Sequence, residues 1–132
     1  MANTYNLDRR LEAEGEGEMD YDYVNDILFF KVKDREYNFS LEFNNIVIDV
    51  DSEQFITGIQ IFEASKFLRI PKESLRKVAN WKFKSKLENN EIRIDLYYQV
   101  IVRNQVISNN IYPIFVQNNN NSNLPNQMVS VN

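Results

Sequence analysis

Residues 46–65, IVIDVDSEQFITGIQIFEAS, decide the fold of this 132-residue chain. Every second residue from Ile46 to Val50 is an apolar β-branched residue, and a period of two is the signature of a strand. Asp51 and Ser52 are turn formers. The chain resumes at Ile56 with a second run rich in β-branched residues. We therefore expect a β-hairpin.

The pairing within this hairpin follows from the positions of its isoleucines. A turn at residues 53–54 sets Ile48 against Ile59 and Ile46 against Ile61, which places all four on one face. Slipping the register by one residue would turn every isoleucine over, so burial of that face should fix the pairing.

Two further features belong to the same stretch. Gly58 falls opposite Asp49, where a missing side chain indicates a close approach or a bulge. After Phe62 the β-branched run ends, and Ala64 and Leu68 lie one helical turn apart. We expect a short helix to follow the hairpin directly.

Alternating patterns on both sides of this core complete the fold. They occupy residues 19–23, 28–33 and 37–43 before the hairpin, and 81–87, 92–102 and 111–116 after it. Pairing is expected to set Tyr21 against Phe30 and Trp81 against Tyr98. Pro71 suits the first turn of a second helix. The prediction is an α+β fold, an antiparallel β-meander sheet of about seven or eight strands with two short helices inserted after the fifth strand.

A family resemblance covers roughly residues 19–68. The segments that carry it are Tyr21-Asp22-Tyr23, Asn25-Asp26-Ile27-Leu28, Ile48-Asp49-Val50-Asp51, Thr57-Gly58-Ile59-Gln60-Ile61 and Ala64-Ser65. This order resembles a small prokaryotic family catalogued as domain of unknown function 2283. Members usually have Glu where this chain has Gln60, and Gly in the turn where it has Gln54 or Phe55. The resemblance implies a fold and a prokaryotic origin, and it implies no established activity.

The ends of the chain differ in composition from its centre. We expect an N-terminal acidic arm over residues 1–18, a single α+β domain over 19–116 and an Asn-rich C-terminal tail over 117–132. The tail, QNNNNSNLPNQMVSVN, also contains four apolar residues that could form a short docking segment: Leu124, Met128, Val129 and Val131.

Composition argues against most chemistries. The chain has neither cysteine nor histidine, so it lacks disulfides, thiolate sites and the commonest general base. Asp49, Asp51 and Glu53 are spaced like the first half of a calcium loop, but Gln54 and Gln60 stand where such a loop needs Gly and Glu. No apolar run approaches 18 residues. We expect no catalytic residue, metal or cofactor, no membrane span, and a cytoplasmic protein.

Charge is distributed unevenly along the chain. Residues 1–65 carry 5 basic and 15 acidic side chains, whereas residues 66–93 carry 9 basic and 3 acidic ones. The candidate acidic partner surface comprises Glu12, Glu14, Glu16, Glu18, Asp20 and Asp22. The candidate phosphate or partner patch comprises Lys72, Arg76, Lys77, Lys82, Lys84 and Lys86. Phe29, an aromatic on the polar face of its strand, is a candidate dimer contact.

Three functions are compatible with these features. The first is a non-enzymatic protein-interaction or regulatory module, antitoxin-like in neutralising a basic partner through its acidic half. The second is a nucleic-acid- or ribosome-associated factor that uses the basic patch. The third is a structural subunit of an assembly with ordered termini. A protein partner and a homodimer are expected, with nucleic acid or a ribosome as the alternative.

Overall fold

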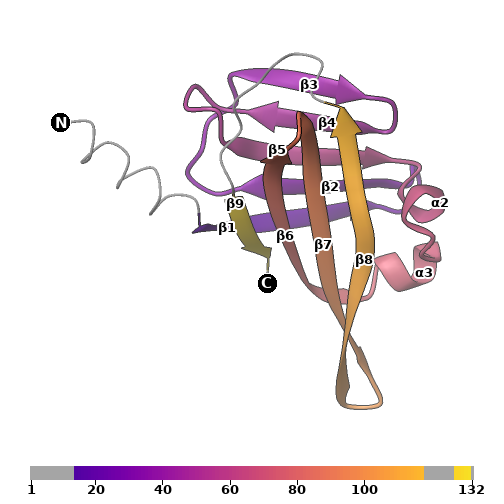
Figure 1. Ribbon diagram of the computed structural model, residues 1–132. Helices are drawn as coiled ribbons and strands as arrows, with labels where there is room; N and C mark the ends of the chain where they lie inside the picture. The colour runs from indigo at the N-terminus through magenta and orange to yellow at the C-terminus, as the bar shows by residue number, and fades with distance from the viewer. Residues whose placement is uncertain (1–13, 118–126, 132) are drawn as a thin grey trace.

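The computed structural model describes residues 14–117 and 127–131 (Figure 1). Its described residues form one mixed sheet of nine strands. The strands are β1 (Glu14–Asp22), β2 (Ile27–Val32), β3 (Phe39–Phe43), β4 (Ile46–Val50), β5 (Ile56–Phe62), β6 (Val78–Glu88), β7 (Glu91–Val102), β8 (Gln105–Gln117) and β9 (Gln127–Val131). Two short helices, α2 (Ala64–Leu68) and α3 (Lys72–Leu75), follow β5.

The sheet folds over on itself to enclose the core. Its strand order is β3-β4-β5-β2-β1-β9-β6-β7-β8. In Figure 1 the first five strands run across one layer, and β6, β7 and β8 cross in front of them. Phe30 from the first layer meets Trp81 and Phe83 from the second, with ring centroids 5.3 and 6.2 Å apart. These three side chains are at most 3% exposed, so the layers share one dry interior.

The hairpin predicted from residues 46–65 is confirmed. Ile46 pairs with Ile61 and Ile48 with Ile59, and all four side chains are buried. Because these isoleucines fill the interior, a slip by one residue would expose them to water. The expected pairing of Trp81 with Tyr98 between β6 and β7 is also confirmed.

The two helices are short and lie at the end of β5, as expected (Figure 1). Ala64 and Leu68 of α2 and Leu75 of α3 are buried. The spacing of Leu75, Val78 and Ala79 predicts a second helix that continues to about residue 79, but α3 ends at Leu75. Val78 already belongs to β6 and pairs with Val100. No helix in the described part of the chain is long and apolar enough to cross a membrane.

The expectation of an antiparallel meander is wrong. β9 pairs in parallel with β1 and antiparallel with β6, so it joins the two layers and makes the sheet mixed. It lies inside the predicted Asn-rich tail and contains Met128, Val129 and Val131 of the predicted docking segment. Val129 is fully buried, which explains why this short run is held in the sheet. Leu124 lies outside the described residues.

The predicted register of β1 against β2 is wrong by two residues. Tyr21 pairs with Leu28, and Met19 takes the place opposite Phe30. Asn25-Asp26 predicts a tight two-residue turn, but the last pair is Asp22 with Ile27, so the turn is longer. The Asp22 carboxylate accepts hydrogen bonds from the backbone N–H and the side-chain amide of Asn25 within this turn. A shift of two keeps each side chain on its expected face. β1 also begins at Glu14, inside the stretch assigned to the N-terminal arm.

Candidate functional site

Asp26 in the β1–β2 turn is the hub of a buried hydrogen-bond network. Its carboxylate accepts hydrogen bonds from the Tyr21 hydroxyl at 2.6 Å and from the Ser65 hydroxyl at 2.6 Å. The backbone N–H of Ser65 also donates to it, at 3.0 Å. Burial opposes ionisation of this carboxyl, but the hydrogen bonds from Ser65 and Tyr21 outweigh burial and lower the pKa of Asp26. Asp26 therefore fastens the start of α2 to the first hairpin.

Asp51 organises the β4–β5 turn in a similar way. Its carboxylate accepts the backbone N–H groups of Glu53 and Phe55, both at 2.9 Å. It also faces the Arg35 guanidinium at 2.8 Å, and the two side chains are only 9% and 8% exposed. The guanidinium stacks 3.8 Å above the ring of Phe55. The interpretation of this segment as a polar turn is confirmed.

A hollow opens on the outer face of the first layer, over Gly58 of β5. Its volume is about 360 Å³, within the range of roughly 300 to 1,000 Å³ typical of small-molecule sites. A Cβ atom on Gly58 would lie 3.1 Å from the Asp49 Oδ2 atom and 3.1 Å from the Phe30 carbonyl oxygen. The missing side chain lets the Asp49 carboxylate lie close over the strand.

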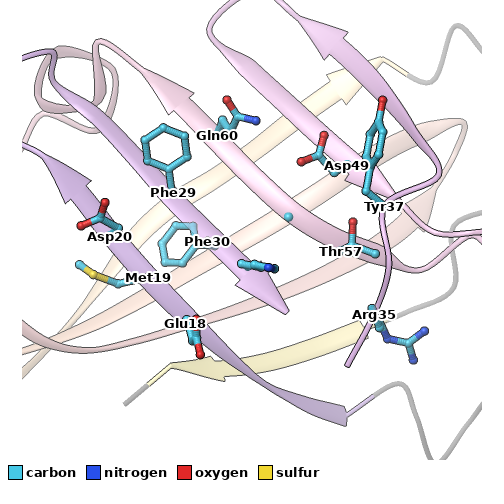
Figure 2. Close-up of a pocket in the computed structure, with 12 residues that line it drawn as sticks. Glu18, Met19, Asp20, Phe29, Phe30, Arg35, Tyr37, Asp49, Thr57 and Gln60 are labelled. Atoms are coloured by element: carbon cyan, nitrogen blue, oxygen red, sulfur yellow. The ribbon is translucent and has the colours of Figure 1, made fainter. Parts of the chain in front are cut away.

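The walls of the hollow come from four strands and a loop. Figure 2 shows Phe29, Gln60 and Asp49 in a row across β2, β5 and β4, with Tyr37 beyond them. Tyr37 belongs to the loop between β2 and β3 and is 63% exposed. The remaining lining residues are Glu18, Met19, Asp20, Phe30, Lys31, Arg35 and Thr57. Aromatic residues, among them Phe29 and Tyr37, and several acidic and basic side chains therefore surround an open concave surface.

These networks and the hollow all fall within one stretch of the chain. Residues 18–65 match the family described as "Protein of unknown function (DUF2283)". The predicted resemblance is confirmed over this segment. Asp26, Asp51 and Ser65, which carried the resemblance, have internal structural roles in the DUF2283 segment. Gly58 and Asp49 of the same segment form the floor of the hollow.

One curated relative reaches beyond the DUF2283 segment. A Methanosarcina mazei protein named "Putative hypoxanthine phosphoribosyltransferase" is 28% identical over 88 residues, which are 67% of this chain and 72% of that protein. No solved structure matches.

The predicted acidic surface follows β1, which leads into the DUF2283 segment. Glu16, Glu18 and Asp20 are exposed and project outward on alternate positions of the strand, and we call these three residues the acidic stripe. Lys33 lies 4.0 Å from Glu16, a distance at the limit of an ion pair. Asp22 instead binds the Asn25 amide. Glu14 starts the strand, and Glu12 lies outside the described residues.

The first part of the predicted basic patch gathers around Tyr23. The Lys72 ammonium lies 5.4 Å and the Arg76 guanidinium 4.6 Å from the centre of that ring. Lys72 also donates to the Tyr23 carbonyl oxygen, and Glu73 accepts the Tyr23 hydroxyl at 2.9 Å. Glu73 thus offsets part of this positive charge. Lys77, just after α3, is exposed.

The second part of the patch lies on the outer face of β6. Lys82 and Lys84 stand 5.9 and 5.8 Å from the ring centre of Tyr97 on β7. Lys86 is opposite Arg93, whose guanidinium lies 5.8 Å from the exposed ring of Phe115. We call Lys82, Lys84 and Lys86 the lysine stripe. The basic residues therefore form two groups, each with its own aromatic partner.

Sequence reasoning placed Phe29 correctly on an outer face but missed its surroundings. Phe29 is half-buried among the residues that line the hollow. Its expected role as a dimer contact stays a prediction. Tyr37 was missed because it opens the alternating run 37–43 and was expected in a strand, whereas β3 begins at Phe39 and Tyr37 lies in the loop before it. Thr57 was missed because it was interpreted only as part of the strand that follows the turn. The glycine opposite Asp49 was the one signal in the sequence that pointed to this place.

Proposed function

We propose that this chain is a non-enzymatic protein-interaction module that binds a basic partner through the outer face of its first layer. The observation that carries the proposal is the acidic stripe beside the hollow. Glu18 and Asp20 are exposed and border that concave surface, whereas Asp26 and Asp51 are occupied inside the fold. Exposed charges of one sign favour association with a partner of opposite charge.

An antitoxin-like role is one form of this proposal. A small acidic protein can neutralise a basic toxin by covering its functional surface, and the net charge of −4 suits that partner. The aromatic side chains of Phe29 and Tyr37 beside the acids would supply buried contact area, since aromatic residues dominate binding energy at interfaces.

The test is capture of a native partner by wild-type and charge-reversed chains. The triple variant Glu16→Lys, Glu18→Lys, Asp20→Lys should lose a basic partner that the wild type retains from native extract. The matched control reverses the lysine stripe: Lys82→Glu, Lys84→Glu, Lys86→Glu should retain it. Equal capture by both variants, or a captured partner that is acidic, would refute the proposal.

The name of the Methanosarcina relative raises phosphoribosyl transfer as an alternative. Pyrophosphate sites usually use glycine-rich loops at helix N-termini. This chain has three glycines, and Gly15, Gly17 and Gly58 all lie in strands. That placement supports the non-enzymatic proposal. Release of pyrophosphate from phosphoribosyl pyrophosphate with hypoxanthine as acceptor would refute it.

Single-stranded nucleic acid is the second candidate ligand, and the lysine stripe favours it. Proteins that bind single strands combine a cationic track with aromatic rings on which bases stack. Lys82 and Lys84 of β6 beside Tyr97 of β7 provide that combination on one face of the sheet. Anisotropy of a labelled oligonucleotide should then fall steeply between about 50 and 200 mM salt. The variant with the lysine stripe reversed should not bind the oligonucleotide. Absence of binding by the wild type at low salt would refute this candidate.

A homodimer remains a proposal of the same kind. Among the described strands β3 and β8 have one neighbour each, and an unpaired edge is a template for another strand. Val106 and Ile107 near the tip of the β7–β8 hairpin, which extends past the other strands in Figure 1, are 63% and 41% exposed. Light scattering should report a dimer at micromolar concentration, and a monomer alone would refute it.

The third hypothesis, a structural subunit of an assembly with ordered termini, is tested by deleting the N-terminal segment alone. Removing residues 117–132 would delete β9, which lies between β1 and β6 in the middle of the sheet. Loss of an assembly could then reflect unfolding. Deleting residues 1–13 alone leaves every described strand in place, and it should dissolve an assembly that depends on the N-terminal segment.

A further inference from the structure

The hollow on the first layer coincides with an irregularity in the sheet. Asp49 pairs with Gly58 and Val50 pairs with Ile56, so Thr57 is an extra residue on β5 with no partner on β4. Such a bulge redirects side chains, and bulges concentrate beside functional sites. Here the extra residue lines the hollow.

The hydroxyl of Thr57 has an unmet hydrogen-bonding requirement. Thr57 is 4% exposed, and its Oγ1 atom has no hydrogen-bond partner among the described residues. Figure 2 shows this side chain among the lining residues, with its hydroxyl oxygen on the side of Tyr37. A buried hydroxyl without a partner is costly, and native proteins rarely leave one. A group bound in the hollow could satisfy it.

The charges around the hollow favour a cation. The hollow is bordered by three acidic residues, Glu18, Asp20 and Asp49, and by the basic residue Lys31. Arg35 also lines it, but its guanidinium faces the Asp51 carboxylate at 2.8 Å. The Asp49 Oδ1 atom accepts the Ser40 hydroxyl, while its Oδ2 atom lies above Gly58. An excess of negative charge therefore surrounds the floor.

The aromatic side chains add a second preference for positive charge. Phe29 presents a half-buried ring on one side of the hollow and Tyr37 an exposed ring on another. The face of an aromatic ring attracts cations, and arginine most often takes that place. A planar guanidinium can stack on a ring while its five donors reach carboxylate and hydroxyl oxygens.

We propose that the hollow over Gly58 receives an arginine side chain from the basic protein partner. This rests on the interaction-module function proposed above and specifies how the partner is anchored. The guanidinium donates to the Asp49 carboxylate and to the Thr57 hydroxyl, and it stacks against Phe29. The acidic stripe borders one side of the hollow, so Glu18 and Asp20 contact further basic residues of the same segment.

The test uses a short probe in place of the unidentified partner. Acetyl-Gly-Arg-Gly-amide is titrated into isotope-labelled protein, and the amide resonances are followed by NMR. The chain has only three glycines, so the Gly58 signal is readily resolved. Arginine peptide should shift Gly58, Phe29 and Thr57. The citrulline peptide, which has the same shape without the charge, should shift them at least about tenfold less at equal concentration.

Variants separate this site from general attraction to an acidic surface. Asp49→Asn removes the charge but keeps an oxygen for Ser40, and it should weaken the arginine peptide about tenfold or more. Phe29→Leu should weaken it while keeping an apolar side chain. Glu42→Gln removes an exposed acid of β3 outside the hollow, and it should leave binding unchanged.

Each other outcome overturns the inference. Equal shifts with citrulline, or an Asp49→Asn variant that behaves like Glu42→Gln, would mean that the hollow does not recognise the guanidinium. Shifts of Gly58 by hypoxanthine but not by the arginine peptide would assign the hollow to a nucleobase. These results leave the interaction-module function standing if the acidic-stripe variant still loses its partner, so the two proposals fail separately.

Discussion

The Ser65 hydroxyl donates a 2.6 Å hydrogen bond to the carboxylate of Asp26, a residue 39 positions earlier in the chain. The backbone N–H of Ser65 donates to the same carboxylate, and the N–H of Ala64 donates to the Asp26 carbonyl oxygen. One turn residue thereby satisfies the first groups of α2, which have no partner within the helix. The link ties the first hairpin to the end of β5.

Replacing Asp26 by Asn should lower the free energy of unfolding by about 2–4 kcal/mol. Oδ1 of Asp26 accepts the Tyr21 hydroxyl and the Ser65 N–H, and Oδ2 accepts the Ser65 hydroxyl. The amide keeps only one of these two oxygens and carries no charge, so one set of bonds loses its acceptor and the other is weakened. Urea unfolding followed by circular dichroism measures the loss. Asp20→Asn, at an exposed position of the neighbouring strand, should change stability by less than about 0.5 kcal/mol. Equal losses in the two variants would contradict the structural role of Asp26.

Stability should also fall in acid because of the same network. The hydrogen bonds from Ser65 and Tyr21 outweigh burial and hold the pKa of Asp26 below its ordinary value. The stabilisation is therefore full above the unfolded pKa of about 4 and declines as the pH drops through the folded pKa. Thermal unfolding between about pH 6 and pH 3 should show a steeper decline for the wild type than for Asp26→Asn.

The alkaline side depends on Tyr21. Burial raises the pKa of its phenol well above the ordinary value, and the hydrogen bond to Asp26 raises that pKa further. The folded protein therefore holds this proton more tightly than the unfolded chain. The stabilisation is complete below the unfolded pKa of about 10 and is lost as the pH rises above it. The thermal unfolding temperature of Tyr21→Phe should fall less steeply above about pH 10 than that of the wild type. The same pH dependence in both proteins would contradict a role of the Tyr21 proton in alkaline stability.

The buried pair of Arg35 and Asp51 predicts a larger loss. Arg35→Met should destabilise the protein by about 3–5 kcal/mol, because it leaves the Asp51 carboxylate buried without its counter-ion. Arg93→Met is the matched control. This variant breaks the ion pair of Arg93 with Asp95, whose side chain is 20% exposed, while that of Arg93 is 35% exposed. It should lower the free energy of unfolding by less than about 1 kcal/mol. Urea unfolding of the two variants decides whether burial sets this difference.

The sequence predicted strand pairing correctly where two alternating runs flank a recognisable turn. The β6–β7 hairpin is the clearest instance. Asn89 and Asn90 adopt φ values of 49° and 62°, as a two-residue hairpin turn requires, so the register followed directly. The predicted β1–β2 register was wrong because the turn between these strands is longer than two residues, with Asp22 hydrogen-bonded to Asn25 inside it.

The parallel pairing of β1 with β9 could not be read in this way. β9 has only five residues, which is too short for a clear alternating pattern. Its parallel partner β1 is far away in the sequence, since Glu14 and the paired Met128 are 114 positions apart. No local turn records that contact. The hollow was missed for a related reason, since it arises from an absent side chain at Gly58, a bulge at Thr57 and a loop residue, Tyr37.

Gly58 should resist substitution for a reason visible in the structure. Its added Cβ would lie 3.1 Å from the Phe30 carbonyl oxygen, which is held in the sheet, and 3.1 Å from the Asp49 carboxylate. Gly58→Ala should cost about 1–3 kcal/mol. In an Asp49→Ala background one of the two contacts is gone, so the same change should cost measurably less. A double-mutant cycle by urea unfolding tests this coupling, and strict additivity would refute it.

Gln127 attaches the C-terminal strand β9 to the backbone of β5. Its side-chain amide donates to the Ile56 carbonyl oxygen at 2.9 Å, and its side-chain oxygen accepts the Ile56 N–H at 2.8 Å. Gln127 is 4% exposed, so Gln127→Ala would leave both backbone groups of Ile56 buried without partners. Each such group costs about 1–3 kcal/mol, and we expect a loss of about 2–4 kcal/mol in urea unfolding. Ser130→Ala, on the half-exposed outer face of the same strand, should stay within about 0.5 kcal/mol of wild type. Equally small losses of stability in the two variants would contradict the attachment of β9 to β5 through the Gln127 amide. Amide hydrogen exchange at Ile56 is a second measurement, and an exchange rate unchanged by Gln127→Ala would contradict it as well.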